Sequence, residues 1–343
     1  MHKNIAVLPC DGAGKEVVPE AIKVLRAAGA NFEFEEFDVN ADSYLRNGVA
    51  IPSDVWNELQ AADSILFGAV GDPRVPDPNY LAGVLLRLRF ELDLYVNLRP
   101  AKLYDDRLSP LRREDRRHVD LMIVRENTEG LYVGMGGRFK KGTKDEIATQ
   151  EDVNTYGGVT RIIEHAFGIA EREVVMVDKS NAMTFAGGLW QERWKAVAAE
   201  HPRIKTRHLY VDAAAMQLVK DPGQFEVIVT GNLFGDILSD LTAELVGGMG
   251  IAPSANINPS SGRGLFEPVH GTAPDIAGKG LVNPVGAILS AAMMVRHLGV
   301  PDMADAIEGE VESAIRARQC TRDIGGDLST SQAGDAIVKR LRD

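Results

Sequence analysis

Two aspartates four residues apart form the clearest chemical motif in the sequence. Asp236 and Asp240 stand in the run Thr230–Asp240, where a β-branched segment ends at a Gly-Asn turn and a helix begins. This spacing places both carboxylates on one helical face, where like charges repel unless they share a cation or stay in solvent. Oxygen ligands of this kind suit Mg²⁺ or Mn²⁺. The alternative interpretation is a charge pair favoured by the helix dipole. Asp212 is a third candidate ligand, although its place after an apolar run also fits a helix N-cap.

Four arginines could bind an anionic substrate. Arg87 and Arg89 lie in one short segment, Arg99 precedes a proline, and Arg125 ends the apolar run that begins at Leu121. Several guanidinium groups could hold a dicarboxylate through paired hydrogen bonds. For Arg87 and Arg89, salt bridges on a helix surface are the alternative.

Lys179 and Tyr132 are candidates for proton transfer. Lys179 ends the apolar run Val174–Asp178, and the carboxyl end of a strand is where α/β sheets bind their ligands. A solvent-exposed lysine is the alternative. Tyr132 could act as a phenolic acid or simply pack as an aromatic side chain.

The elements that must position these residues alternate between strand and helix. Short apolar runs predict strands, and apolar spacing of three to four residues predicts helices, which together indicate an α/β fold with much parallel pairing. The Gly- and Pro-rich segment 247–283 is expected to be a structured loop set, and the polar segment 134–154 is expected to project from the body. The predicted strands are 5–8, 32–37, 64–68, 121–124, 174–177, 209–211 and 227–230. The predicted helices are 15–28, 54–61, 158–170, 186–200, 213–220, 234–246, 284–298, 302–318 and 330–341.

Composition restricts the class of protein. The 343 residues carry 38 Lys+Arg against 49 Asp+Glu, a net charge of −11, which argues against nucleic-acid binding. The length suggests two domains. Cys10 and Cys320 are expected to be free buried thiols in a reducing compartment, and no segment is apolar enough to span a membrane. We therefore expect a cytoplasmic protein without a membrane partner.

Several common catalytic motifs are absent from the sequence. The dinucleotide fingerprint G-x-G-x-x-G is incomplete, since Gly12-Ala13-Gly14 is followed by Val17 where the third glycine belongs. A Walker A lysine loop, a G-x-S-x-G elbow and an H-E-x-x-H pair are also missing. A classical Rossmann fold, a P-loop enzyme and a serine hydrolase are therefore disfavoured.

Taken together, the segments resemble the β-decarboxylating dehydrogenases, the isocitrate/isopropylmalate dehydrogenase family. The resemblance runs from Ile5 to about Asp327. It implies an isocitrate/isopropylmalate dehydrogenase-like α/β fold with two domains around a parallel or mixed sheet. The motifs that carry it are Asp11–Gly14, Leu92–Tyr95, Asn97–Pro100, Arg125–Gly130, Asp178–Asn181, Asn232–Asp240 and Glu267–Asp275.

The resemblance implies a division of the chain and a shared site. Residues 1–98 and 247–343 correspond to the cofactor-binding domain, and 99–246 to the substrate, metal and dimerisation domain with an intersubunit arm at 134–154. The implied assembly is a homodimer whose active sites are built from both subunits, with Lys179 and Asp212 reaching the partner's site. Arg89, Arg99 and Arg125 look like the carboxylate clamp, Tyr132 and Lys179 like the proton-transfer pair, and Asp212, Asp236 and Asp240 like the Mg²⁺ or Mn²⁺ ligands.

The substrate is indicated by the helix before Arg89. Isocitrate enzymes place serine and asparagine donors there, at positions that look like Gly83 and Leu85, and homoisocitrate enzymes place an arginine at Leu86. Leu85 and Leu86 instead present an apolar wall that suits an isopropyl group, as in the leucine-biosynthesis enzymes that oxidise and decarboxylate 3-isopropylmalate. The D-malate/tartrate enzymes share the Leu-Leu pair, so D-malate, tartrate or another substituted malate remains an alternative.

The cofactor is expected to be NAD⁺. Asp275 and Ile276 stand where NADP-dependent isocitrate enzymes place lysine and tyrosine, and an aspartate accepts hydrogen bonds from a ribose diol but repels a 2′-phosphate. A non-catalytic subunit on this fold is the remaining hypothesis, but such a subunit should have lost some of the residues named above. By the resemblance, the cofactor-binding residues are Asp11, Gly12, Ala13, Asn181, Glu267, His270, Gly271, Thr272, Ala273, Asp275, Ile276 and Asn283.

Overall fold

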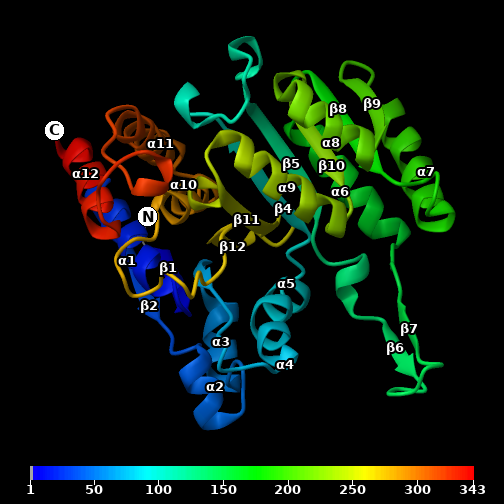
Figure 1. Ribbon diagram of the computed structural model, residues 1–343, viewed down its shortest axis with the longest axis horizontal. Coiled ribbons are helices and arrows are strands. Elements are labelled where there is room, and N and C mark those ends of the chain that lie inside the picture. Colours follow the sequence, from blue (N-terminus) through cyan, green and yellow to red (C-terminus); the bar gives the residue numbers. More distant parts are fainter. Residues whose placement is uncertain (1–2) are drawn as a thin grey trace.

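A ten-stranded mixed sheet runs through the computed structural model, which describes residues 3–343 (Figure 1). The strand order is β2-β1-β3-β12-β11-β4-β5-β10-β8-β9. All neighbours pair in parallel except β12 with β11, β11 with β4, and β4 with β5. The strands are β1 (Lys3–Cys10), β2 (Phe32–Glu36), β3 (Ser64–Ala69), β4 (Val96–Lys102), β5 (Asp120–Glu126), β8 (Glu173–Asp178), β9 (Lys205–Tyr210), β10 (Val227–Thr230), β11 (Pro253–Asn258) and β12 (Arg263–Pro268).

Helices cover both faces of the sheet. Alternate residues of β1 show this, since Ile5 and Val7 belong to one apolar core while Ala6 and Leu8 belong to another. The helices are α1 (Gly14–Ala27), α2 (Ala41–Asn47), α3 (Ser53–Ala61), α4 (Pro78–Leu81), α5 (Arg87–Glu91), α6 (Tyr156–Ile169), α7 (Thr184–Glu200), α8 (Val211–Lys220), α9 (Asn232–Val246), α10 (Val285–His297), α11 (Pro301–Arg316) and α12 (Thr330–Arg342).

Local sequence explains where several helices begin. Thr155 caps α6 through the N–H of Gly158, and Ser329 and Gln332 form a reciprocal capping box at the start of α12. Pro301 occupies the first turn of α11, where no intrahelical N–H is needed. These signals agree with the predicted helix positions to within a few residues.

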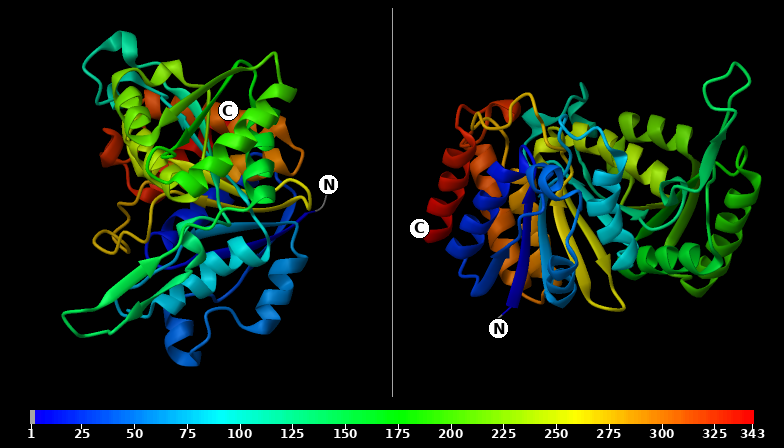
Figure 2. Two further views of the ribbon diagram at one scale, coloured as in Figure 1. Left: turned by 90° about the vertical axis from the view of Figure 1, so that its right-hand side faces the viewer. Right: turned by 90° about the horizontal axis from the view of Figure 1, so that it is seen from below.

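A two-stranded hairpin extends away from the rest of the chain. Its strands are β6 (Gly136–Phe139) and β7 (Ile147–Gln150), which pair only with each other in the sheet topology. Every residue of both strands is exposed, and the hairpin stands clear of the other elements in Figure 1 and in the right view of Figure 2. The predicted projecting segment 134–154 is thereby confirmed.

The prediction for segment 247–283 was wrong in part. β11 and β12 lie inside it, at the centre of the sheet, and β11 is buried along its whole length. The apolar pattern does not reveal β11 because Ser254 and Asn256 point into a buried polar network with Asn97. The patterns also missed β4, α2 and α4, and they placed Val211 in a strand although it begins α8.

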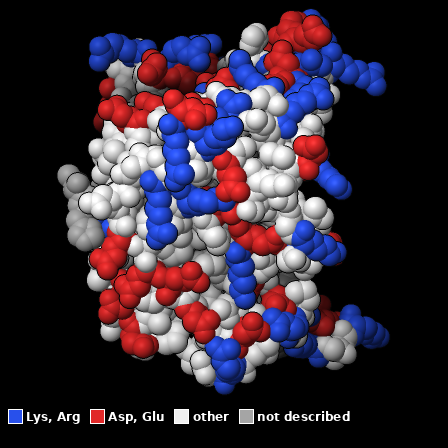
Figure 3. Space-filling model, turned by 90° about the vertical axis from the view of Figure 1, so that its left-hand side faces the viewer, with Lys and Arg blue, Asp and Glu red and all other residues white. Residues whose placement is uncertain are grey.

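Surface charge is mixed on the face that carries the β2 edge of the sheet. Acidic and basic side chains are interspersed there (Figure 3), and Lys23 pairs with both Glu20 and Asp335. Within residues 3–343, none of the helices combines the length and apolar content needed to cross a bilayer. Cys10 and Cys320 are buried and free, as expected.

Candidate active site

A cavity of about 250 Å³ lies where β3, β4, β5 and β12 meet α9 and the turns from α4 to α5. Its lining combines two kinds of surface. The polar side consists of Arg89, Arg99, Arg125, Tyr132, Asp236, Glu267 and His270, and the apolar side consists of Phe67, Val70, Leu81, Leu85, Leu86 and Val269. The structure therefore brings the three predicted clamp arginines together with the predicted leucine wall.

Arg125 and Arg99 share the carboxylates of α9. Arg125, at the end of β5, has a side chain only 1% exposed, and its Nη1 donates to Asp236 Oδ1 at 2.6 Å. Arg99 Nη1 lies 3.3 Å from Asp236 and 3.5 Å from Asp240, and it donates to Ser239 Oγ at 2.7 Å. Asp236 and Asp240 thus project from one helical face as predicted, beside two buried cations.

Burial and mutual repulsion change the proton affinities of this cluster. Loss of solvent, reinforced by the neighbouring arginines, lowers the pKa of Arg125, and burial likewise lowers the pKa of Arg99. Burial disfavours the Asp236 carboxylate, but Arg125 and the Tyr132 hydroxyl outweigh that effect, so the pKa of Asp236 lies below its ordinary value. Burial raises the pKa of Asp240, which Arg99 only partly offsets.

Tyr132 is fixed against the same carboxylate. Its hydroxyl donates to Asp236 Oδ2 at 2.6 Å, and the Arg125 guanidinium lies 5.2 Å from the centre of its ring. Burial, followed by the bond to Asp236, raises the pKa of Tyr132, so the phenol stays protonated at neutral pH. The turn that presents it begins at Gly130, whose φ of 78° strongly favours glycine.

Arg89 and Glu267 form a buried pair on another side of the cavity. Arg89 Nη2 donates to Glu267 Oε1 at 2.9 Å, and Asn256 Nδ2 donates to the same oxygen at 2.9 Å. The resemblance assigned Glu267 to the cofactor, but in this structure one of its carboxylate oxygens accepts a hydrogen bond from Arg89. Sequence reasoning could not have found that contact, because 178 residues separate the two partners.

Lys179 and Asp212 meet each other but do not line this cavity. Lys179 follows β8 and Asp212 lies in the first turn of α8, with Nζ 2.9 Å from Oδ2. The lysine lowers the pKa of Asp212 through this hydrogen bond. Asp212 is not brought to Asp236 and Asp240, and the part of the chain from residue 3 onward contains no group of three His, Cys, Asp or Glu residues that could hold a metal ion.

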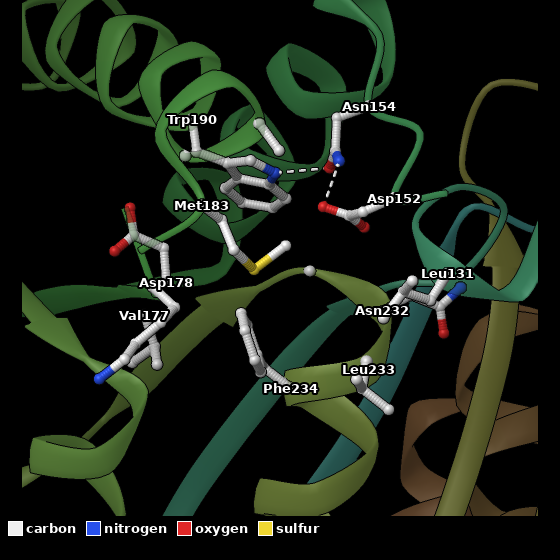
Figure 4. Close-up of a pocket in the computed structure, with 14 residues that line it drawn as sticks. Leu131, Asp152, Asn154, Val177, Asp178, Met183, Trp190, Asn232, Leu233 and Phe234 are labelled. Atoms are coloured by element: carbon white, nitrogen blue, oxygen red, sulfur yellow. Dashed lines mark hydrogen bonds between the residues drawn. The ribbon is translucent and has the colours of Figure 1, made fainter. Parts of the chain in front are cut away.

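Lys179 instead lines a second, smaller cavity of about 90 Å³. It lies between α7, the start of α9 and the base of the projecting hairpin (Figure 4). Trp190 Nε1 donates to Asn154 Oδ1, and Asn154 Nδ2 donates to Asp152 Oδ2, both at 2.9 Å. Met183 and Phe234 close much of the remaining wall, so this cavity is largely apolar.

The two predicted cofactor segments lie against each other. Ala13 N donates to Thr272 O at 2.8 Å, and a side chain at Gly12 would collide with that same carbonyl. His270 lines the large cavity, and its Nε2 is buried without a hydrogen-bond partner. Burial lowers the pKa of His270, which keeps the ring neutral and its nitrogen available to a ligand. Gly271 and Ala273 continue this loop.

Other predicted cofactor residues have internal partners or lie at the surface. The Asp11 carboxylate accepts bonds from the N–H groups of Ala41 and Gly71 and from the Tyr80 hydroxyl. Asn283 donates to Asp323 and accepts from Val285 N. The remaining three, Asn181, Asp275 and Ile276, are exposed.

Known proteins resemble this chain over nearly its whole length. A family model described as isocitrate/isopropylmalate dehydrogenase matches residues 4–337. A 3-isopropylmalate dehydrogenase from Rhodococcus erythropolis (strain PR4 / NBRC 100887) is 44% identical over 343 residues, covering 98% of this chain and 100% of that protein. A 3-isopropylmalate dehydrogenase from Thermobifida fusca (strain YX) is 46% identical over 347 residues, covering 98% of this chain and 97% of that protein.

Two solved structures have closely similar folds. The crystal structure of isocitrate dehydrogenase from Methylococcus capsulatus superposes with a TM-score of 0.92 at 37% identity, covering all of both chains. The TT0538 protein from Thermus thermophilus superposes with a TM-score of 0.90 at 38% identity, covering all of this chain and 68% of that one.

Proposed function

Because the chain belongs to the isocitrate/isopropylmalate dehydrogenase family, we propose that it oxidises and decarboxylates a β-substituted D-malate, with 3-isopropylmalate as the substrate. The chain is a decarboxylating dehydrogenase, and its α/β fold with a large mixed sheet is that of the family. The proposed reaction is a step of leucine biosynthesis, in keeping with the names of the relatives.

The observation that carries the choice of substrate is the two-sided cavity. Arg89, Arg99 and Arg125 supply the cations that a malate dicarboxylate needs, and Leu85 and Leu86 line the same space. A carboxylate buried against this leucine wall would cost several kcal/mol unless it were paired. An isopropyl group instead gains about 25 cal/mol for each Å² of apolar surface removed from water. Leu81, Val70 and Val269, which sequence reasoning did not single out, extend the same apolar side.

The chain's own acid and base groups suit the two proton transfers. The pKa of Tyr132 lies above its ordinary value, so the phenol is protonated and its Oη can donate a proton to the carbon left by decarboxylation. Lys179 Nζ, in its neutral amine form, is the proposed acceptor of the substrate's hydroxyl proton. The arginines hold the two carboxylates in place throughout, which keeps the reacting atoms oriented.

The residues present fit a divalent cation and a dinucleotide. The oxygen set of Asp236, Asp240 and a second subunit's Asp212 is typical of Mg²⁺ or Mn²⁺ sites. The unpartnered His270 Nε2 and the adjoining Gly12–Ala13 segment fit a bound dinucleotide, and the exposed Asp275 favours NAD⁺ over NADP⁺. When bound, NAD⁺ accepts the hydride and the cation polarises the oxygen from which the substrate proton has left.

A homodimer with shared sites is part of the proposal. Lys179 and Asp212 pair with each other away from the large cavity, so only a second copy would bring such a pair to it. Met216 and Val219 on α8 and Ile237 on α9 are exposed apolar side chains that a second copy could cover. Phe139 and Ile147 are likewise exposed on the hairpin, which suits its proposed role as an intersubunit arm.

Domain division and location are proposed on the same basis. Residues 1–98 and 247–343 would form the cofactor-binding domain, and 99–246 the substrate, metal and dimerisation domain, with the boundary inside β4, which pairs with β11 of the first part and β5 of the second. The free buried thiols of Cys10 and Cys320 support a cytoplasmic location. Neither nucleic acid nor a membrane is a proposed partner.

The experiment that tests the proposal is a panel of NADH-formation assays. The purified enzyme is offered 3-isopropylmalate, D-malate, tartrate, isocitrate and homoisocitrate with NAD⁺ and Mg²⁺ or Mn²⁺. We expect the highest kcat/KM with 3-isopropylmalate. A higher value with D-malate or tartrate would keep the reaction but replace the substrate, and no turnover of any member would refute the function.

A further inference from the structure

Asn232 is the first residue of α9 and lies between the two cavities. It lines the smaller cavity beside Leu131 (Figure 4), while its side chain binds Arg125, which lines the larger one. We propose that Asn232 is a positioning residue that orients the Arg125 guanidinium toward a carboxylate of the substrate. This inference rests on the proposed function, since it concerns the binding of a malate in the larger cavity.

The contacts of Asn232 fix the guanidinium along one edge. Asn232 Oδ1 accepts from Arg125 Nε at 3.1 Å and from Nη2 at 2.8 Å. Its Nδ2 donates to the carbonyl of Glu129 at 2.9 Å, which holds the amide in the orientation that Arg125 needs. The residue is 3% exposed, so water cannot easily replace these bonds.

Counting donors shows what this arrangement leaves for a ligand. A guanidinium has five N–H groups in a rigid fork. Asn232 occupies one on Nε and one on Nη2, and Asp236 occupies one on Nη1. One N–H on each Nη therefore remains, and each can donate a charge-assisted hydrogen bond to a carboxylate of the substrate.

The neutrality of the amide matters as much as its shape. Asp236 already places one carboxylate on Arg125, at 2.6 Å. A second carboxylate at position 232 would give the single positive charge of Arg125 two anionic partners inside the protein and repel an incoming substrate anion in this low-dielectric site. An amide accepts the same two hydrogen bonds without adding charge, so Arg125 remains a cation for the substrate.

A merely structural role for Asn232 fits the contacts less well. A residue at a helix start commonly accepts a hydrogen bond from N–H groups of the first turn. The described bonds of Asn232 go instead to Arg125 and to Glu129 O, on β5 and in the loop that follows it. The side chain therefore connects α9 to the clamp rather than capping its own helix.

A double-mutant cycle with Arg125 tests the proposal. If Asn232 acts through Arg125, Asn232→Ala should raise the KM for 3-isopropylmalate about tenfold and leave the KM for NAD⁺ within about twofold. In the Arg125→Lys background, which lacks the guanidinium group, Asn232→Ala should raise the KM for 3-isopropylmalate by less than about twofold. Should the alanine variant not fold, Asn232→Ser, whose hydroxyl is too short to make both bonds, takes its place in the cycle.

The control is a second buried asparagine. Asn258 is 7% exposed and bonds Asp93 and the loop after β11, away from the cavity. Asn258→Ala should lower the Tm without raising the substrate KM. The proposal would be overturned if the effects of Asn232→Ala and Arg125→Lys on the KM for 3-isopropylmalate multiplied in the double mutant. It would also be overturned if Asn232→Ala raised the KM values for 3-isopropylmalate and NAD⁺ equally. Failure of the proposed function would appear separately, as wild-type enzyme inactive on the whole substrate panel; if another malate is preferred, the cycle is run with that substrate.

Discussion

Gly235 leaves the space through which the Arg125 side chain passes, and replacing it by alanine tests the geometry of the clamp directly. A methyl group at position 235 would lie 2.5 Å from Arg125 Cγ and 2.6 Å from its Cβ. Ordinary contact begins near 3.4 Å, so the arginine stem or the start of α9 must move by about 0.9 Å. Arg125 is packed on all sides and cannot swing into solvent, so the guanidinium moves with its stem.

The size of the effect follows from that displacement. A misplacement of about 1 Å in a positioning group costs roughly 10²-fold in rate. We therefore expect Gly235→Ala to lower kcat/KM about 100-fold, which is about 2.7 kcal/mol at 1.36 kcal/mol per decade. The free energy of unfolding should change less, because crowding costs about 1–3 kcal/mol while alanine in place of a helical glycine gains about 0.5–1 kcal/mol.

The matched control is Gly309, which lies within α11 with no atom near the position of an added methyl group. Gly309→Ala should raise the free energy of unfolding by about 0.4–1 kcal/mol and leave kcat/KM unchanged. Both variants are measured by NADH formation and by urea unfolding. A folded Gly235→Ala enzyme with kcat/KM within threefold of wild type would refute the argument that the Arg125 stem has no room to spare.

Four further outcomes are expected. EDTA should abolish turnover and Mg²⁺ or Mn²⁺ should restore it, and full activity in chelator would contradict the proposed metal site. Lys179→Met and Tyr132→Phe should each lower kcat by roughly 10²-fold or more, and a near-wild-type rate would remove that residue from the proton transfers. NAD⁺ should be preferred over NADP⁺ by at least about 100-fold in kcat/KM, and equal efficiency would show that Asp275 does not face the ribose. Burial lowers the pKa of His165 below its ordinary value of 6.5, so the unfolded chain binds the proton more readily. The free energy of unfolding of the wild-type protein should therefore fall as the pH drops through about 6.5. Between about pH 7.5 and 5.5, the Tm of His165→Leu should fall less than the Tm of wild type. Parallel curves of Tm against pH for the two proteins would contradict this.

Much of the fold could be predicted because most elements carry their signal locally. Runs such as Val174–Val177 and Val227–Thr230 are apolar because these central parallel strands are buried on both faces. The helices α6, α8, α11 and α12 likewise show an apolar face at the expected spacing. β11 could not be found in this way, because Ser254 and Asn256 are buried through hydrogen bonds to Asn97, on a strand more than 150 residues earlier in the chain.

The candidate site divides in the same way between sequence and structure. Short local motifs reveal which side chains the site contains. Asp236 and Asp240, for example, share a helical face because an α-helix such as α9 has about 3.6 residues per turn. Their partners depend on how the sheet orders its strands, since β4, β5 and β12 bring Arg99, Arg125 and Glu267 to one cavity from distant parts of the chain. Only the tertiary structure shows that Asn232 accepts hydrogen bonds from Arg125, that Gly235 leaves room for the Arg125 stem, and that Lys179 pairs with Asp212 outside the cavity. Packing between non-neighbouring segments leaves no local pattern in the sequence.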